Sequence, residues 1–311
     1  MVHHYHHFPM HDIIVRAVSF FLIVLLAYAL KRAGVFTRND GFVLSRVVMN
    51  ITLPCAIITS FSSGGFTGMM LIFILFGLGI NLILLAVAFM MSRGKGREDK
   101  IHYLLSVPAY NIGAFTLPFA SGMLGPVSAL TVCMFDAGNA FQCVGFDYAI
   151  TKAVVDGNGR FSPLKAIKTV LKVPTFDCYM IFITLSLLKV PVPEEIFSFT
   201  SIVGSANGPL AMIMIGLMLE IRFDKDSSVR AFSVLLVRYA FAIVLAYIFY
   251  NYLPFSHEIR KGLAIVVFSP ISSAAPSFTM DLRGDTALAG MVNSLSIAVS
   301  IVVIPLLVIL L

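Results

Sequence analysis

Two stretches of this chain are too long, too apolar and too free of charge for a water-soluble fold. Residues 69–92 and residues 286–311 contain no Asp, Glu, Lys or Arg. About 20 apolar residues are enough to cross a bilayer as a helix. Apolar residues make up 59% of the chain and charged residues 12%, against about 45–50% and about 25% in soluble domains. The sequence therefore predicts a helical membrane protein.

Ten such segments can be drawn, which predicts an all-α protein with ten transmembrane helices. Most of the 22 Lys and Arg residues then fall into loops on one face, which the positive-inside rule makes cytoplasmic. Arg238 lies inside the eighth segment, and its side chain is expected to extend back toward that basic face. The positive charge is therefore a matter of membrane orientation and does not suggest a nucleic acid. The segments are 13–30, 44–62, 69–91, 101–122, 127–150, 173–190, 196–219, 231–252, 262–281 and 286–311.

The longest polar loop, residues 151–172, divides the chain into two sets of five segments. Five is odd, so the second set must be inverted relative to the first, which is typical of transporters with inverted repeats. Pro118 and Pro276 agree with a repeat, since they lie 158 residues apart and each is followed at the same distances by Ala-Leu. The expected divisions are an extracellular His-rich tail (1–12), the first repeat (13–150), a cytoplasmic linker (151–172) and the second repeat (173–311).

Prolines interrupt the fourth and ninth segments among small and polar residues. Interrupted helices at corresponding places of two halves indicate a transporter's binding site, where helix N-termini attract an anion and freed carbonyls hold a cation or water. Simple proline kinks are the alternative. The candidate substrate-binding residues are Asn111, Gly113, Thr116, Pro118, Ser269, Pro270, Ser272, Ser273 and Pro276. The candidate supporting residues are Asn50, Pro54, Asn139, Asn207 and Asn293, and for the asparagines helix–helix packing is the alternative.

Asp136 lies near the middle of the fifth segment, where a carboxylate costs about 3 kcal/mol on insertion scales. It must therefore face the interior, where burial favours the neutral form. This suits proton coupling, with a purely structural hydrogen bond as the alternative. Asp147 is closer to the basic loop and is expected to be interfacial or paired. Glu220 and Asp281 end segments beside arginines, so surface ion pairs are expected there, with a gating role as the alternative.

The remaining features exclude most other classes of function. The chain contains no hydrolase triad, P-loop, haem motif or zinc motif, so neither an enzyme nor a cofactor is expected. The N-terminal histidines offer metal ligands, but a solvated tail is the expectation. Lys31 and Arg32 follow the first apolar segment instead of preceding it, so we expect a retained membrane anchor and not a cleaved signal peptide.

Several of these motifs resemble the auxin efflux carrier family, within the superfamily that also contains bile-acid carriers. They are the run from Leu44 to Pro54, the run from Asn111 to Pro118 with its glycine-containing turn, and Pro270 followed by Asp281-x-x-Gly284-Asp285. The resemblance implies ten helices in two inverted repeats, crossing broken helices four and nine, and elevator-like movement. It implies a small organic anion as substrate and a crossing at Asn111, Pro118, Pro270 and Pro276.

The chain departs from the long plant carriers of that family. It lacks their large central loop, and Leu117 and Phe119 flank Pro118 where those carriers have asparagines. A prokaryotic-type carrier of a small carboxylate is therefore expected, and not an auxin carrier, with H⁺ as the coupling ion. The alternatives are a Na⁺-coupled organic-anion symporter and a membrane sensor that binds ligand without moving it. The oligomeric state stays open, a homodimer included.

Overall fold

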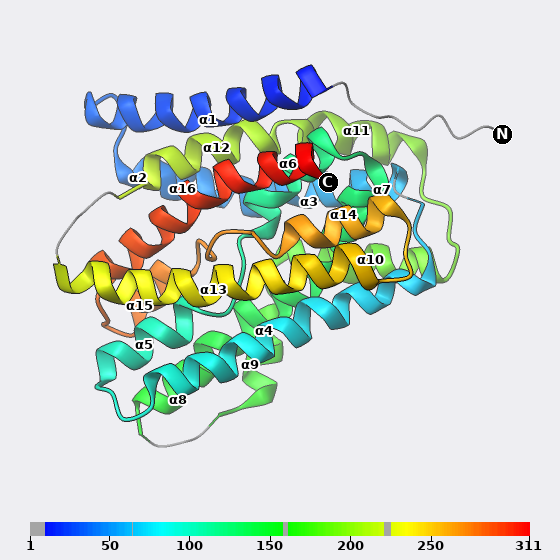
Figure 1. The fold of residues 1–311 in the computed structure, drawn as a ribbon. Coiled ribbons are helices and arrows are strands. Elements are labelled where there is room, and N and C mark those ends of the chain that lie inside the picture. The colour runs from blue at the N-terminus through cyan, green and yellow to red at the C-terminus, as the bar shows by residue number, and fades with distance from the viewer. Residues whose placement is uncertain (1–9, 64, 158–160, 221–224) are drawn as a thin grey trace.

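The computed structural model describes residues 10–63, 65–157, 161–220 and 225–311, in which the regular elements are helices (Figure 1). The residues expected to form a His-rich tail lie mostly outside this part. The helices before residue 160 are α1 (Met10–Arg32), α2 (Arg38–Val47), α3 (Leu53–Ser63), α4 (Leu71–Ser92), α5 (Arg97–Ser106), α6 (Leu117–Met123), α7 (Pro126–Ala140) and α8 (Tyr148–Val155). Those after it are α9 (Pro163–Val170), α10 (Pro174–Leu187), α11 (Glu194–Ser205), α12 (Asn207–Met218), α13 (Lys225–Tyr252), α14 (His257–Val266), α15 (Ala275–Asp281) and α16 (Thr286–Leu310).

Several of these helices join into spans through wider, π-helical turns. Such turns at Val48–Thr52 and Phe141–Asp147 connect α2 to α3 and α7 to α8. Within the described residues, seven continuous runs are long and apolar enough to cross a membrane, and α9 with α10 makes an eighth if this pair, bent by 84°, counts as one span. The expected fourth and ninth segments are interrupted. The count of ten spans therefore stays a prediction.

Prolines start helices in this fold more often than they break them. Pro276 stands in the first turn of α15, where a missing backbone N–H costs nothing. Pro118 lies at the start of α6, directly after the π-helical turn Ile112–Thr116 and inside one helix that extends to Met123. The chain is instead interrupted earlier, at residues 107–111, which contain Pro108, and at residues 267–274, which contain Pro270. Our prediction of interrupted segments agrees with this, but Pro118 and Pro276 follow the breaks and do not form them.

Residues 151–172, expected as a polar linker, contain the end of α8 and the whole of α9. Ser162 caps α9 through its side chain, which accepts from the backbone N–H of Lys165, and Pro163 follows in the first turn. The Ser-Pro pair that reads as a breaker in the sequence is therefore a helix start.

The helices differ greatly in how much of their surface the protein covers. In α7 nearly every side chain from Ser128 to Asn139 is buried, whereas α1 buries little beyond Ile13, Val24 and Ala27. The outer faces of α1 and α13 carry exposed apolar side chains, as lipid-facing helices do. Figure 1 shows α1 lying along α12 at one edge of the bundle.

Candidate functional site

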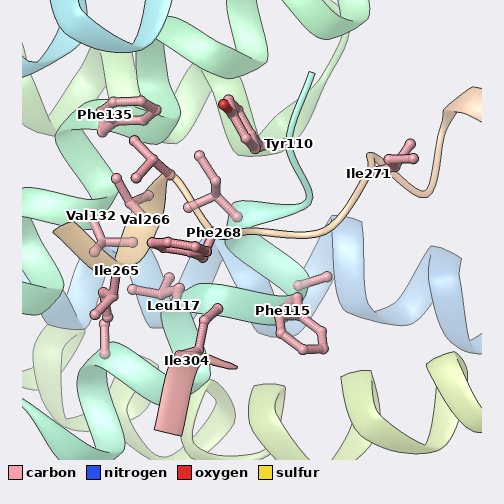
Figure 2. Packing of buried hydrophobic residues seen from close by; sticks show 14 of the residues in the cluster. Tyr110, Phe115, Leu117, Val132, Phe135, Ile265, Val266, Phe268, Ile271 and Ile304 are labelled. Atoms are coloured by element: carbon pink, nitrogen blue, oxygen red, sulfur yellow. The ribbon is translucent and has the colours of Figure 1, made fainter. Parts of the chain in front are cut away.

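The two interrupted segments meet inside the bundle. Tyr110 and Ile271 form an isolated antiparallel bridge, and the backbone N–H of Asn111 donates to the carbonyl of Pro270 at 2.9 Å. Both bridge residues are buried, and Figure 2 shows the two extended stretches passing through the apolar cluster. The first break also contains Ala109 in the left-handed region, at φ 59°. Two non-helical backbones thus share one enclosed place, where protein must satisfy their polar groups.

Two asparagines satisfy the first break. Oδ1 of Asn81 accepts from the backbone N–H of Ala109 at 2.7 Å. Asn139 bonds both backbone groups of Tyr110, accepting from its N–H and donating to its carbonyl, each at 2.9 Å. Asn139 was expected to support the site, and here it holds backbone in the conformation of the break.

A close contact between α4 and α7 brings these asparagines together. A Cβ atom on Gly77 would lie 2.1 Å from the carbonyl oxygen of Phe135, and one on Gly138 would lie 2.1 Å from that of Ile74. Only glycine permits such a separation of two helices. Because Asn81 lies one turn after Gly77, and Asn139 follows Gly138, this contact places both amides beside the break.

Serines of α16 satisfy part of the second break. Oγ of Ser296 accepts from the backbone N–H of Ile271 at 3.0 Å, and Ser300 donates to the carbonyl of Phe268 at 2.7 Å. Across the two breaks, the hydroxyls of Thr116 and Ser269 lie 2.5 Å apart. Thr116 and Ser269 are both candidate binding residues, and the fold brings them into contact.

Arg238 is the main correction to the sequence analysis. We expected its side chain to extend to the basic face, but the residue is only 2% exposed. Nη1 donates to the carbonyls of Val107, Pro108 and Ala109 at 2.7, 3.1 and 3.1 Å. Nη2 donates to the carbonyl of Ser269 at 3.2 Å. The guanidinium therefore joins both breaks.

Asp136 is buried, as expected, and both of its oxygens accept hydrogen bonds. Oδ1 accepts from Asn139 and Oδ2 from the hydroxyl of Tyr179 in α10, both at 2.8 Å. A Cβ on Gly113 would lie 3.1 Å from Oδ2 and even closer to Leu53. Asp136 thus lies directly beside the first interrupted segment, bonded to a helix from the other half of the chain.

The remaining supporting residues differ in position. Asn207 is buried, accepts from Thr52 at 3.0 Å and donates to the carbonyl of Gly113 at 3.3 Å, so it reaches the site. Asn50 does not, because it is exposed and donates to the carbonyl of Arg46 in its own helix. Pro54 is buried within α3. Asn293 is buried in α16, and its Oδ1 has no hydrogen-bond partner among the described residues.

Polar atoms without protein partners mark where a ligand could bind. Nδ2 of Asn111 is one of these, in a residue that is 6% exposed. Ser272 accepts from the thiol of Cys143 and from the backbone N–H of Ala274. Ser273 is half-buried, and Pro276 is buried in α15. Of the candidate binding residues, Asn111 therefore has the clearest free donor.

Asp147 is a second correction. We expected it near the membrane surface or paired, but it is 2% exposed and neither oxygen has a hydrogen-bond partner in the described part of the chain. Gln142 lies one π-helical turn earlier and is also buried, and its amide nitrogen and oxygen have no hydrogen-bond partner among the described residues. Asp147 is buried because it lies eight residues before the end of a helix that extends to Val155.

At the ends of the spans the expected ion pairs take different partners. Glu220 pairs with Arg38 of α2, while Arg222, its neighbour in the sequence, lies outside the described residues. Arg230 lies 3.6 Å from Asp99 and 3.7 Å from Asp285. Partly exposed pairs of this kind contribute about 0–1 kcal/mol.

Known proteins resemble this chain over both halves. A family described as a membrane transport protein matches residues 12–164, and the sodium bile acid symporter family matches residues 209–311. An uncharacterized transporter of Methanothermobacter thermautotrophicus is 24% identical over 216 residues, covering 68% of this chain and 69% of the relative. These relatives are transporters and not enzymes. The apolar helices and these similarities indicate a multi-pass membrane protein, in which one part resembles a membrane transport protein family and another part resembles the sodium bile acid symporter family.

Proposed function

We propose that this protein is a secondary active transporter of a small organic anion, and that its binding site lies where the two interrupted segments meet. The observation that carries this proposal is the contact between the breaks, through Tyr110 with Ile271 and Asn111 with Pro270. Broken helices of this kind line the substrate sites of secondary transporters. The interrupted segments would then be the fourth and ninth of ten spans.

Corresponding helices support the two breaks, which favours an inverted repeat. The 158-residue spacing of Pro118 and Pro276 carries Asn81 to a position next to Arg238 and Asn139 to a position next to Ser296. Asn81 and Asn139 bond the first break, while Ser296 bonds the second and Arg238 bonds both. In a repeat of two five-helix units, equivalent spans would therefore both supply side chains that hydrogen-bond the backbone of the breaks.

An anion suits the charges around the breaks. Arg238 brings a permanent positive charge, and no carboxylate of the described residues lies within ion-pair distance of it. Nδ2 of Asn111 adds an unpartnered donor. The helical turns that begin at Ile112 and Ala275 direct backbone N–H groups back toward the breaks. A carboxylate could accept from these donors.

An elevator-like movement fits the way the helices pack. Helices α1, α2, α3, α10, α11 and α12 pack mainly with one another, and α4, α7, α13, α14, α15 and α16 form a second set that carries both breaks. The hydrogen bond from Tyr179 to Asp136 crosses between the sets. Protonation of Asp136 would change this bond, because a neutral carboxyl group accepts more weakly. We therefore place the coupling proton on Asp136.

The proposed location is the cell membrane, with the basic loops in the cytoplasm. Lys165, Lys168 and Lys172 would then face the cytoplasm along with Arg93 and Lys95, in accord with the positive-inside rule. Both ends of the chain in this sequence would face outward.

Flux and binding measurements test the proposal together. Purified protein is screened for stabilisation by mono- and dicarboxylates, since a ligand of the folded state raises the unfolding temperature. Stabilising compounds are then tested for uptake into proteoliposomes. Asn111→Ala should lose uptake, whereas Asn50→Ala, which changes an exposed asparagine of the same residue type, should keep it. Stabilisation without uptake would favour a sensor, and uptake retained by Asn111→Ala would place the site elsewhere.

A further inference from the structure

The carbonyl groups freed by the two breaks do not point into open space. Those of Val107, Pro108 and Ala109 from the first break and that of Ser269 from the second converge on one side chain, at 2.7–3.2 Å. In transporters with broken helices, unwound carbonyls are the groups that coordinate a coupling cation such as Na⁺. Here a guanidinium occupies that position.

The ends of two helices reinforce the attraction for a positive charge. Helix α5 ends at Ser106, directly before Val107, and α14 ends at Val266, three residues before Ser269. The C-terminal end of a helix carries about half a negative charge. Two such ends therefore face the guanidinium, although no carboxylate of the described residues pairs with it.

The side chain is well suited to act as a permanent ion. An arginine does not lose its proton in proteins, and its planar fork can reach several acceptors at once. Its guanidinium also lies over the ring of Tyr110, 4.4 Å from the centroid, within the range of a cation–π contact. Because Tyr110 forms the bridge to Ile271, the charge is fixed where the breaks meet.

We propose that Arg238 is a built-in substitute for a coupling cation, so that this carrier assembles its two breaks without Na⁺. Removing the side chain should leave a group of backbone oxygens that binds a monovalent cation from solution. The idea rests on the proposed function in treating the site as that of an ion-coupled carrier. Its test reads protein stability and needs no knowledge of the substrate.

The experiment compares unfolding temperatures in detergent, in NaCl, KCl and choline chloride at equal ionic strength. The variants are Arg238→Ala and Arg260→Ala. Arg260 is a matched control, because it also donates to a backbone carbonyl, that of Tyr250 at 2.7 Å, and lies over a tyrosine ring. Among the described residues, Arg260 donates to this one carbonyl only, so removing its side chain would not leave a group of oxygens that could bind a cation.

The wild-type protein and Arg260→Ala should unfold within about 1 °C in the three salts, while NaCl or KCl should raise the midpoint of Arg238→Ala by at least about 3 °C, in a saturable way. Guanidinium ion, at concentrations well below denaturing ones, should also rescue this variant. A selective, saturable stabilisation of the wild-type protein by Na⁺ would overturn the proposal. So would an Arg238→Ala protein that folds and responds equally to all the salts.

If Arg238→Ala does not fold in any salt, the more conservative Arg238→Lys decides. A lysine keeps the charge but cannot reach four carbonyls at once, so this variant should be less stable than wild type yet remain indifferent to Na⁺. Selective stabilisation of Arg238→Lys by Na⁺ would refute the proposal that the positive side chain at this position replaces a coupling cation. Failure to find any transported anion would affect the proposed function alone, since none of these readouts involves transport.

Discussion

The substitution Gly77→Ala should force α4 and α7 apart beside the first break, whereas Gly79→Ala, two residues later in the same helix, should not. The Cβ of Gly77→Ala would lie 2.1 Å from the carbonyl oxygen of Phe135 and 3.2 Å from the backbone N of Asn139. A carbon and an oxygen normally approach to about 3.3 Å. Helices α4 and α7 would therefore have to separate by roughly 1.2 Å, because the opposing atoms are backbone and cannot rotate away.

That separation disturbs the hydrogen bonds that define the first break. Asn81 on α4 bonds Ala109, and Asn139 on α7 bonds Tyr110 twice, at 2.7–2.9 Å. Overpacking costs about 1–3 kcal/mol, and three weakened bonds inside a membrane protein cost about 0.6 kcal/mol each. The free energy of unfolding of Gly77→Ala should thus fall by about 3–5 kcal/mol.

Gly79→Ala is the matched control. A Cβ there meets nothing within 4 Å, and Gly79 lies in the same helix, so alanine should stabilise slightly, by about 0.4–1 kcal/mol. Both variants and the wild-type protein are unfolded by denaturant in the same detergent, and their midpoints and slopes are compared. Equal stability of Gly77→Ala and Gly79→Ala would refute the close helix contact, and with it our account of how the asparagines are placed.

Three further predictions concern the polar residues. The free energy of unfolding of Asn139→Ala should fall by about 1–3 kcal/mol, because buried polar groups are left unpaired. That of Asn111→Ala should stay within about 0.5 kcal/mol of the wild-type value. Denaturant titration compares the three proteins. Asp136→Asn should lose its response to an imposed pH gradient in proteoliposomes and keep carboxylate exchange; an unchanged response would remove Asp136 from coupling. A cysteine at Lys165, exposed on α9, should be shielded from impermeant thiol reagents in intact cells, and labelling from outside would contradict the orientation.

Local features of the sequence predicted the helices and the interruptions. The uncharged runs at 69–92 and 286–311 contain α4 and α16, because such stretches leave the backbone no other way to satisfy its groups in lipid. The interruptions were expected from prolines among small residues, Pro118 and Pro276 above all, but the breaks contain Pro108 and Pro270 instead. Only the family resemblance implied that the two broken segments cross, and the residues themselves did not show that the breaks touch, since that contact joins residues 110 and 271. Nothing in the local pattern determines such a pairing.

The prediction for Arg238 was wrong because a long charged side chain inside a span can reach polar partners in two directions. An arginine two turns inside a span can extend to the membrane surface or bind groups within the protein, and its position in the chain does not distinguish these. The repeat contains a signal that favours the second arrangement, because the 158-residue spacing places Arg238 next to the equivalent of Asn81. If a polar residue of one repeat bonds the backbone of a break, then the polar residue at the equivalent position of the other repeat is a candidate for the same role.

Hydrogen-bond partners divide the buried polar residues into two groups, and this division narrows the search for substrate contacts. Asn81, Asn139 and Arg238 bond backbone groups that would otherwise be unpaired in the membrane, so their replacement damages the fold before it affects a ligand. Asn111 and Asn293 keep unpartnered amide atoms within the described protein, and a buried polar atom normally has a partner. A ligand or water that supplies those partners would contact them directly. Altered substrate preference without loss of stability is therefore expected from the second group, and the first group should change stability and transport together.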